Sequence, residues 1–488
     1  MSLKTIPPKR EDFERLTGYE YIKNKLNPKT QMGQKYFKHI QPMTYEHILE
    51  HFDDTAFVIR LIEREAKLIA DIEHDLECIL DVSRTIEKIT NSEILDEIEL
   101  FELKNFVLVA QEIRNKTQQV FSSHERFSLP DLEEVIDLLD PERLRLPTFY
   151  IYDAYDERLS QIRKQKRELL QKKNAKDDNL KERESIEDVV LQLTEQERSV
   201  ENEVLERLSK KLWNFADLLE KALQKIKYLD IILAKAKLSV ELELSKPIVH
   251  SKDHELQNIR ITGMFNPQLK EELAKHGKSY QPVDVTIKRG VTVIVGANMS
   301  GKSVVLRTVA LIQYMALLGF FVPAKHAELP FLELIALVTE DFQRPLSGLS
   351  SFASEITLID SAYRDSQNTS ALILIDEPAR TTNPYEGTAI VNALVKCFEK
   401  TKSFVVIVTH FDDVECHTRF RVKGLKEDAL KNIQSVNDIQ ELMDYELIPD
   451  DGKTVPKEAI RVMDLLGVSK DIVSQALKLL DRHSEEYK

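Results

Sequence analysis

The segment that decides the fold reads Val291-Thr-Val-Ile-Val295-Gly296-Ala-Asn-Met-Ser-Gly301-Lys302-Ser303, an apolar run that leads into a loop bounded by glycines. This spacing is that of a phosphate-binding loop (P-loop), here placed between a predicted strand and an apolar helix that starts near Val304. In such a loop, backbone N–H groups surround phosphates at a helix N-terminus, the lysine reaches the outer phosphates and the hydroxyl binds magnesium. The predicted nucleotide-binding residues are Gly296, Ala297, Asn298, Met299, Ser300, Gly301, Lys302, Ser303 and Val304.

A second element, Ala371-Leu-Ile-Leu-Ile375-Asp376-Glu377, ends an apolar run in two adjacent carboxylates. Ligands of α/β proteins bind at the carboxyl ends of strands, so this pattern indicates a Walker B strand. We expect Asp376 to hold magnesium together with Ser303, and Glu377 to position and polarise an attacking water. The alternative is a solvated strand end without a catalytic role.

A third apolar run, Val405-Val-Ile-Val408-Thr409-His410, also ends in polar residues. It follows the carboxylate strand by one helix-length connection, which favours placing His410 near the γ-phosphate as a sensor. A purely structural histidine is the alternative.

The strand-like segments 258–263, 283–287 and 291–295 alternate with helical ones, which predicts a mostly parallel sheet with crossover helices. We therefore expect an α/β P-loop ATPase domain in the C-terminal half. A single core stops growing near roughly 250–300 residues. A chain of 488 residues thus predicts several domains.

The preceding half has a helical pattern. Residues 44–121 and 154–237 contain no glycine, and their apolar residues recur at helical spacings. A stripe with gaps of four and three residues, typical of a helix packed on a partner helix, consists of Leu208, Leu212, Phe215, Leu219, Ala222, Ile226, Leu229 and Leu233. Residues 174–179 suit a hairpin turn. We expect one helix to run out and a longer one to return, as a long antiparallel arm after an all-α core.

The charge pattern is acidic overall and basic on this arm. Lys and Arg total 68 against 82 Asp and Glu, so the net charge of −14 gives no global attraction to nucleic acid. The outer arm carries a local basic excess, formed by Arg163, Lys164, Lys166, Arg167, Lys172, Lys173, Lys176, Lys181 and Arg183. Either this is a solvated helical face, or it contacts a polyanion or an acidic partner.

Three widely spaced cysteines, Cys78, Cys397 and Cys416, fit neither a disulfide framework nor a zinc site. The first 18 residues lack the apolar core of a signal peptide, and no segment approaches the roughly 20 apolar residues of a membrane span. We expect a soluble cytoplasmic protein that does not bind membranes.

Three stretches, the P-loop among them, connect the chain to a known family. The others are Gly348-Leu-Ser350-Ser351-Phe352-Ala-Ser-Glu355 and Asp376-Glu377-Pro-Ala-Arg380-Thr-Thr382-Asn-Pro-Tyr385-Glu386-Gly387. In order and spacing they resemble the ATPase core of the MutS mismatch-repair proteins. The resemblance covers roughly residues 258–480, and residues 154–240 are similar to the lever helices of that family.

The resemblance implies an ABC-type ATPase that uses ATP and Mg²⁺ and dimerises through its ATPase domains, each completing the other's site. The signature serine that acts across such a dimer corresponds to Ser350, so the implied catalytic set is Lys302, Glu377, His410 and Ser350. The predicted division is an N-terminal extension (1–43), an all-helical core (44–153), a helical lever arm (154–245), the ATPase domain (246–425) and a C-terminal helical dimerisation segment (426–488).

This sequence also departs from the family pattern. Leu349 stands where the family usually carries a basic residue, and residues 378–384 lack the usual glycine-rich turn. These departures concern the coupling between two sites rather than nucleotide binding. We expect no mismatch recognition, because nothing before Thr44 resembles a mismatch-reading domain.

The partner moved by the levers has more than one interpretation. The sequence after Asp376 is similar to MutS-related ATPases associated with adenosylcobalamin-dependent lysine aminomutase, which implies reactivation of such an enzyme as a protein client. The alternative is an ATPase that recognises branched or recombining DNA by shape, through Lys172, Lys173 and Lys176. A third interpretation is an ATPase used only for assembly.

Overall fold

A computed structural model of the chain describes residues 3–121, 124–146, 148–175, 180–296, 300–339, 351–411, 413–425, 443–450, 460, 463 and 467–486. The chain separates into two compact units. Unit 1 comprises Met1–Leu26, Ile40–Ala56 and Lys235–Lys488, and unit 2 comprises Asn27–His39 and Phe57–Ala234. The predicted five-part domain division stays a prediction.

A seven-stranded sheet forms the centre of unit 1. Its order is β1 (Lys4–Ile6), β7 (Leu334–Val338), β8 (Ala371–Asp376), β9 (Phe404–Thr409), β5 (Gly290–Val295), β10 (Thr418–Leu425) and β11 (Met443–Pro449). Neighbouring strands are parallel except β10 and β11, which confirms the predicted α/β class with a mostly parallel sheet. Of the three segments from which that sheet was predicted, only 291–295 belongs to it, because 258–263 and 283–287 pair antiparallel in a second sheet. Val295 lies opposite Thr409, and Asp376 lies opposite Val408. The carboxyl ends of β5, β8 and β9 therefore meet at one edge.

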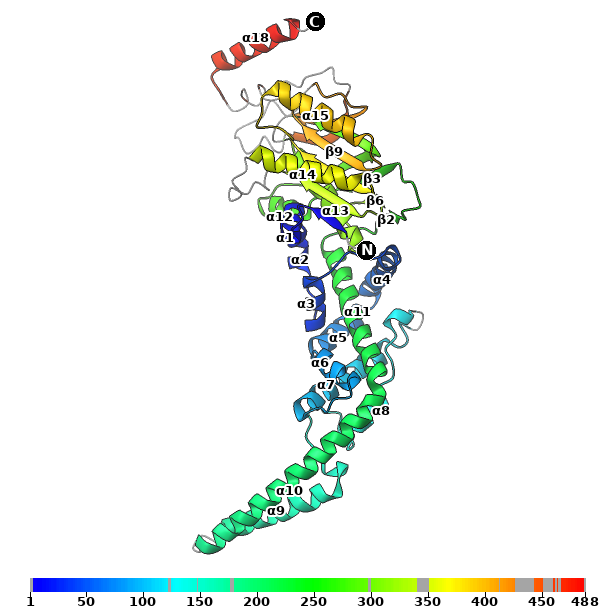
Figure 1. Cartoon of the computed structure of the whole chain (residues 1–488), viewed down its shortest axis with the longest axis vertical. Coiled ribbons are helices and arrows are strands. Elements are labelled where there is room, and N and C mark those ends of the chain that lie inside the picture. Colours follow the sequence, from blue (N-terminus) through cyan, green and yellow to red (C-terminus); the bar gives the residue numbers. More distant parts are fainter. Residues whose placement is uncertain are drawn as a thin grey trace. The chain divides into compact units, whose positions relative to one another are not determined.

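Helices cover both faces of this sheet (Figure 1). One face packs against α14 (Ser351–Ser366) and α15 (Pro384–Phe398). The helix α13 (Lys302–Leu317) contacts β7, β8 and β9 but has no residue in that core, so it covers the other face. Strands covered on both faces need apolar side chains at successive positions, and β8 is buried along its whole length.

A second sheet of four strands has the order β2 (Ile248–His250), β6 (His326–Pro330), β3 (Asn258–Met264) and β4 (Val283–Lys288). Its β4 strand alternates buried and exposed residues, as expected for a sheet with one covered face. Unit 1 also contains α1 (Arg10–Thr17), α2 (Tyr19–Lys25), α12 (Pro267–Lys275) and α18 (Lys470–Glu486). No helix in the described part of the chain is apolar over a length that could cross a membrane.

Unit 2 is helical in its described residues. It contains α3 (Gln31–Lys38), α5 (Ala66–Glu77), α6 (Ser83–Thr90), α7 (Glu97–Thr117), α8 (Glu133–Leu139), α9 (Glu157–Ala175), α10 (Leu180–Leu212), and the short 3₁₀ turns η1 (Glu125–Phe127), η2 (Asp153–Tyr155) and η3 (Trp213–Phe215). The helices α4 (Tyr45–Arg64) and α11 (Ala216–Glu241) each contribute residues to both units. Local signals explain several boundaries; α7, for example, begins with a capping box of Asp96 and Glu99.

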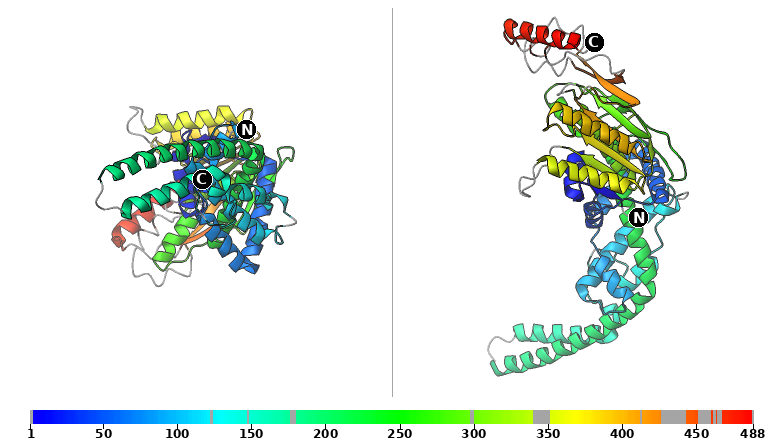
Figure 2. Two further views of the ribbon diagram at one scale, coloured as in Figure 1. Left: turned by 90° about the horizontal axis from the view of Figure 1, so that it is seen from below. Right: turned by 45° about the horizontal axis from the view of Figure 1, so that its top comes forward.

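The α9 and α10 helices lie side by side, so the predicted antiparallel pair is present (Figures 1 and 2). Arg163 of α9 joins them through ion pairs to Glu197 and Glu201, both at 2.8 Å. The predicted turn falls partly on residues 176–179, which lie outside the described residues. Seven of the eight predicted stripe residues are buried, the exception being half-buried Phe215. The returning helix is the longer one, with 33 residues in α10 against 19 in α9, but the 3₁₀ turn η3 separates α10 from α11, so the predicted stripe spans two helices.

Candidate nucleotide site

The P-loop connects β5 to α13. Gly301 precedes the helix with φ of +81°, a left-handed conformation that favours glycine. Lys302 is only 4% exposed, and its Nζ donates to the carbonyl oxygen of Gly296 at 2.7 Å. The ammonium group thus lies across the loop instead of in solvent. The predicted binding residues Ala297, Asn298 and Met299 lie outside the described residues.

The Asp376 carboxylate ends β8 and accepts a hydrogen bond from Ser303 in the first turn of α13. Burial raises the pKa of Asp376, and the charge of adjacent Glu377 adds to this rise, although the Ser303 hydrogen bond opposes it. Its Oδ1 is buried without a hydrogen-bond partner among the described residues. These two oxygen-bearing side chains, one at a strand end and one at a helix start, are therefore neighbours, and their binding of magnesium stays a prediction.

Three nitrogen-bearing side chains lie near the Glu377 carboxylate. Its carboxylate lies 3.5 Å from Lys302 Nζ, 3.6 Å from Arg380 Nη1 and 3.6 Å from His410 Nδ1. Its backbone N–H donates to the carbonyl oxygen of Val408 at 2.8 Å, which fixes the residue to the end of β9. Three segments distant in the sequence therefore meet at one carboxylate.

The turn after β8 holds Glu377 in a strained conformation. Glu377 has φ of +48° and Ala379 has φ of +62°, both in the left-handed region that non-glycine residues rarely adopt. Such residues cost about 1–3 kcal/mol each and persist where the surrounding structure fixes them. Here the turn must adopt left-handed conformations without any glycine. The position of the Glu377 carboxylate therefore depends both on this backbone conformation and on the side chains around it.

His410 follows β9 directly and is exposed. The structure brings His410, Lys302 and Glu377 together, and their roles toward a nucleotide stay predictions. Ser350 lies outside the described residues, so its predicted role across a dimer stays a prediction. The neighbouring Ser351 is the first residue of α14.

The donor set fits magnesium and a nucleotide triphosphate. Magnesium prefers oxygen ligands, and the Ser303 hydroxyl and Asp376 carboxylate supply them at adjacent positions. The buried, unpartnered Asp376 Oδ1 provides a ligand atom that no described protein group satisfies. Ser300 Oγ, inside the P-loop, is likewise buried without a hydrogen-bond partner in the described part of the chain.

A cavity of about 520 Å³ opens beside the P-loop. Its lining includes Ser300 and Gly301 of the loop, Val304 of α13, and two tyrosines from elsewhere in the chain, Tyr280 and Tyr445. Burial raises the pKa of both phenols. A Cβ atom added at Gly301 would lie 3.0 Å from Tyr445 Cδ1, so the tyrosine ring packs against the loop.

Sequence reasoning missed both tyrosines. Tyr280 stands before β4, and Tyr445 reaches the cavity because β11 pairs with β10, next to the P-loop strand β5. The Gln281 amide nitrogen donates to Asp444 Oδ1 at 2.8 Å and connects the two segments. No local sequence pattern marks this pairing.

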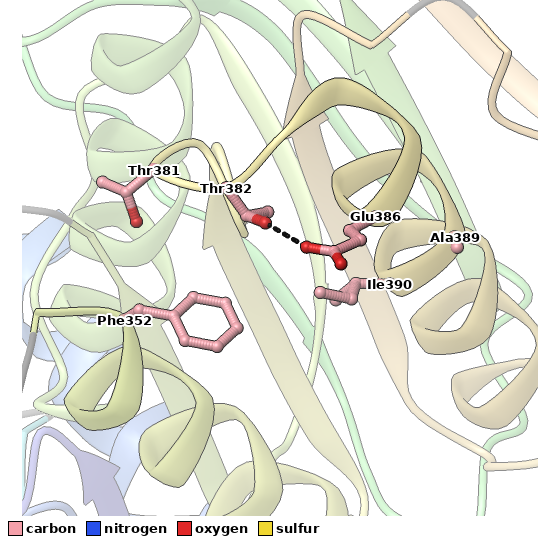
Figure 3. Close-up of a pocket in the computed structure, with 6 residues that line it drawn as sticks. All are labelled: Phe352, Thr381, Thr382, Glu386, Ala389 and Ile390. Atoms are coloured by element: carbon pink, nitrogen blue, oxygen red, sulfur yellow. Dashed lines mark hydrogen bonds between the residues drawn. The ribbon is translucent and has the colours of Figure 1, made fainter.

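A second, open hollow lies near the strained turn (Figure 3). Phe352 at the start of α14 points toward Ile390 of α15 from the opposite side, and Thr381 and Thr382 border it. Thr382 donates to Glu386 Oε2 at 2.9 Å. The adjacent Tyr385 is 82% exposed, which is unusual for an aromatic side chain.

Comparison with known proteins agrees with this geometry. Residues 292–483 match the family description MutS domain V. The DNA mismatch repair protein MutS of Carboxydothermus hydrogenoformans is 25% identical over 308 residues, covering 62% of this chain and 35% of that protein. Endonuclease MutS2 of Caldanaerobacter subterraneus subsp. tengcongensis is 27% identical over 290 residues, covering 59% and 34%. The chain thus spans about a third of the length of these curated relatives.

Proposed function

Because the chain belongs to the MutS family through residues 292–483, we propose that it is a magnesium-dependent ATPase that binds DNA of branched or altered structure. The observation that carries the ATPase part is the convergence of Lys302, Asp376 and Glu377 at one edge of the parallel sheet. The names of the relatives, a DNA mismatch repair protein and an endonuclease, favour DNA over an aminomutase as the partner.

Each side chain at the carboxyl edge of the sheet has a role in the proposed hydrolysis. Lys302 stabilises the negative charge that develops on the outer phosphate, and Ser303 with Asp376 holds magnesium. Glu377 orients the attacking water, and His410 holds the Glu377 carboxylate from the end of β9. Bound magnesium supplies neutralisation of phosphate charge.

The cavity lined by Tyr280 and Tyr445 is proposed to take the base of the nucleotide. It adjoins Ser300 and Gly301, which belong to the phosphate loop, so a ligand with phosphates in the loop extends naturally into it. Ligand sites combine an apolar or aromatic lining with a few polar groups, as this cavity does.

We further propose that the hollow of Figure 3 faces the second subunit of a homodimer. Exposed Tyr385 and the apolar pair Phe352 and Ile390 supply the aromatic and apolar surface that subunit interfaces use. Ser350 would act on the partner's nucleotide from the segment preceding α14.

The arm carries the proposed DNA contact. On α9, Lys164, Arg167 and Lys172 are exposed, and no ion pair joins them to a carboxylate within the described residues. By contrast, Lys173 pairs with Glu187 at 2.5 Å and Lys166 pairs with Glu197 at 2.7 Å. Lys176 lies outside the described residues. Lys164, Arg167 and Lys172 are therefore better residues for a test than the three lysines predicted from the sequence.

The test is binding of the full chain to a four-way DNA junction over a range of salt concentrations. Each phosphate contact contributes about 0.9 to the slope of log affinity against log salt. Charge reversal of Lys164, Arg167 and Lys172 to Glu is expected to weaken binding and flatten this slope by about 2–3. Lys221→Glu, an exposed lysine of α11, is the matched control. An unchanged slope in the triple variant excludes the arm as the DNA contact.

A protein client is the second candidate, favoured by one observation. Arg163 and Lys166 are already neutralised by Glu197, Glu201 and Asp153, and the whole chain carries a charge of −14. Such an arm suits a protein surface as well as a polyanion. Reactivation of an adenosylcobalamin-dependent lysine aminomutase is the specific form of this proposal. Binding of the chain to that enzyme with an affinity that neither salt nor added DNA changes would favour it.

A further inference from the structure

A lysine buried in unit 1 lies at the far end of the P-loop helix. Lys235 of α11 is fully buried, and its Nζ donates to the carbonyl oxygens of Leu318 at 2.8 Å and Gly319 at 3.0 Å. It also lies 3.1 Å from His51 Nδ1. The Lys235 nitrogen thus has three polar partners, two of them backbone carbonyl oxygens that follow α13.

The surroundings of this ammonium group are tightly packed. The ring centroid of Phe320 lies 4.4 Å from Nζ, and burial holds the pKa of Lys235 well below its ordinary value. Gly319 has φ of +70°, and a Cβ atom there would lie 3.2 Å from Nζ and 3.1 Å from Met43 Sδ. The turn after α13 therefore has little freedom to move without moving Lys235.

Both helices joined by this contact lead to sites of function. α13 begins at Lys302 of the P-loop and is buried along most of its length, so a displacement at its start is carried to its end. α11 runs from Ala216 to Glu241, and its residues up to Ala234 belong to unit 2. Lys235 is the first residue of that helix in unit 1.

The other end of α11 adjoins an irregular turn. There η3 interrupts the helical path, and the indole N–H of Trp213 donates to the carbonyl oxygen of Glu93 at 3.0 Å. Four residues before Trp213, Ser209 Oγ donates to the carbonyl oxygen of Leu205 at 2.8 Å, a contact that bends helices. A 3₁₀ segment within a long helix often marks a hinge.

We propose that Lys235 is a positioning residue that couples the P-loop helix to α11, so that nucleotide binding changes the surroundings of Trp213 at the η3 turn. This inference rests on the proposed nucleotide site and goes beyond it by naming the residue that carries the signal. Coupling of this kind is energetic: the contact must differ between the nucleotide-free and nucleotide-bound states.

The chain contains a single tryptophan, so its fluorescence reports on this turn alone. The experiment adds magnesium and AMP-PNP to the full chain and measures the Trp213 emission maximum and acrylamide quenching. Calorimetry measures nucleotide affinity separately. In the wild type we expect a nucleotide-dependent shift. In Lys235→Met, which keeps the side-chain volume, affinity is expected to change less than about twofold while the shift is lost.

Lys221→Met, at an exposed position on the same helix, should retain the shift. If Lys235→Met does not fold, Lys235→Gln, which retains a hydrogen-bond donor, replaces it. A merely structural lysine would lower the melting temperature of the variant without selectively removing the nucleotide response.

The outcomes separate the two proposals. A wild type that binds AMP-PNP without any change at Trp213, or a Lys235→Met variant that keeps the full shift, overturns the coupling inference and leaves the nucleotide site standing. A wild type that does not bind the nucleotide overturns the proposed function and the inference together.

Discussion

At the scale of single residues, the proposed function depends on two adjacent carboxylates in unlike environments. Asp376 is buried at a strand end, with one oxygen lacking a protein partner in the described part of the chain. Glu377 is surrounded by Lys302, Arg380 and His410. Asp376 suits metal binding, because a bound cation compensates the carboxylate for the hydration that it loses on burial. Glu377 suits water activation, because its buried Oε2 has no hydrogen-bond partner among the described residues while three nitrogen-bearing side chains lie 3.5–3.6 Å from the carboxylate.

Glu377→Gln should abolish hydrolysis while leaving nucleotide binding intact. The amide keeps the shape of the side chain but cannot polarise water, and general-base contributions amount to about 10²–10⁴-fold in rate. Steady-state phosphate release and calorimetry check the two halves of this prediction. A variant that hydrolyses ATP at the wild-type rate would contradict the assigned role.

Asp376→Asn should stabilise the nucleotide-free protein at pH 7 and remove its magnesium-dependent nucleotide affinity. The pKa of Asp376 is raised in the folded state, so the folded protein binds that proton more tightly than the unfolded chain. The unfolding free energy contributed by this group therefore rises as pH falls through the folded pKa and is lost as pH increases. The gain in melting temperature should accordingly be larger at pH 7 than at pH 4, as thermal unfolding at both pH values can test.

At the scale of elements, the carboxyl ends of β5, β8 and β9 assemble the site, and β11 completes it. Continuous apolar runs reveal buried parallel strands, which is why these three strands and their terminal residues were predictable from sequence. Tyr445 was not, because antiparallel pairing of β10 and β11 brings it to the P-loop from a distant segment. The η3 turn was also missed, since the apolar stripe continues through it without a breaker.

Tyr445→Ala should weaken adenine-nucleotide binding about tenfold, because an aromatic contact contributes about 0.5–1.5 kcal/mol beyond the apolar area it buries. The loss should appear in affinity rather than in the rate of bound nucleotide turnover. Calorimetric titration with AMP-PNP measures it. Tyr150→Ala, at a half-exposed tyrosine of unit 2, is the control and should bind normally.

Arg163→Met should loosen α9 from α10. Arg163 is mostly buried and contacts Glu197, Glu201 and Asp153, so its removal leaves three carboxylates without this partner. We expect a loss of about 1.5–3 kcal/mol, the range for hydrogen bonds to charged groups. Hydrogen exchange of α9 amides reports it directly. Exchange rates indistinguishable from the wild type would show that apolar packing alone holds the pair.

At the scale of the whole molecule, an acidic chain combines a compact α/β unit with a helical unit whose α9 helix is locally basic. The net charge of −14 opposes DNA binding, so any DNA contact must be local and sensitive to salt. The sequence established the α/β class and family resemblance through short motifs. The sequence could not identify the partner, because it does not show which basic side chains of the arm are already paired with carboxylates and which are free to bind a partner.

The most direct test of the central claim is steady-state ATP hydrolysis by the full chain, alone, with a four-way DNA junction at moderate salt, and with an inactivated adenosylcobalamin-dependent aminomutase. Glu377→Gln serves as the blank. We predict magnesium-dependent hydrolysis that the junction stimulates and the variant lacks. Hydrolysis no greater than that of Glu377→Gln, or stimulation by the aminomutase and not by DNA, would contradict a DNA-binding ATPase.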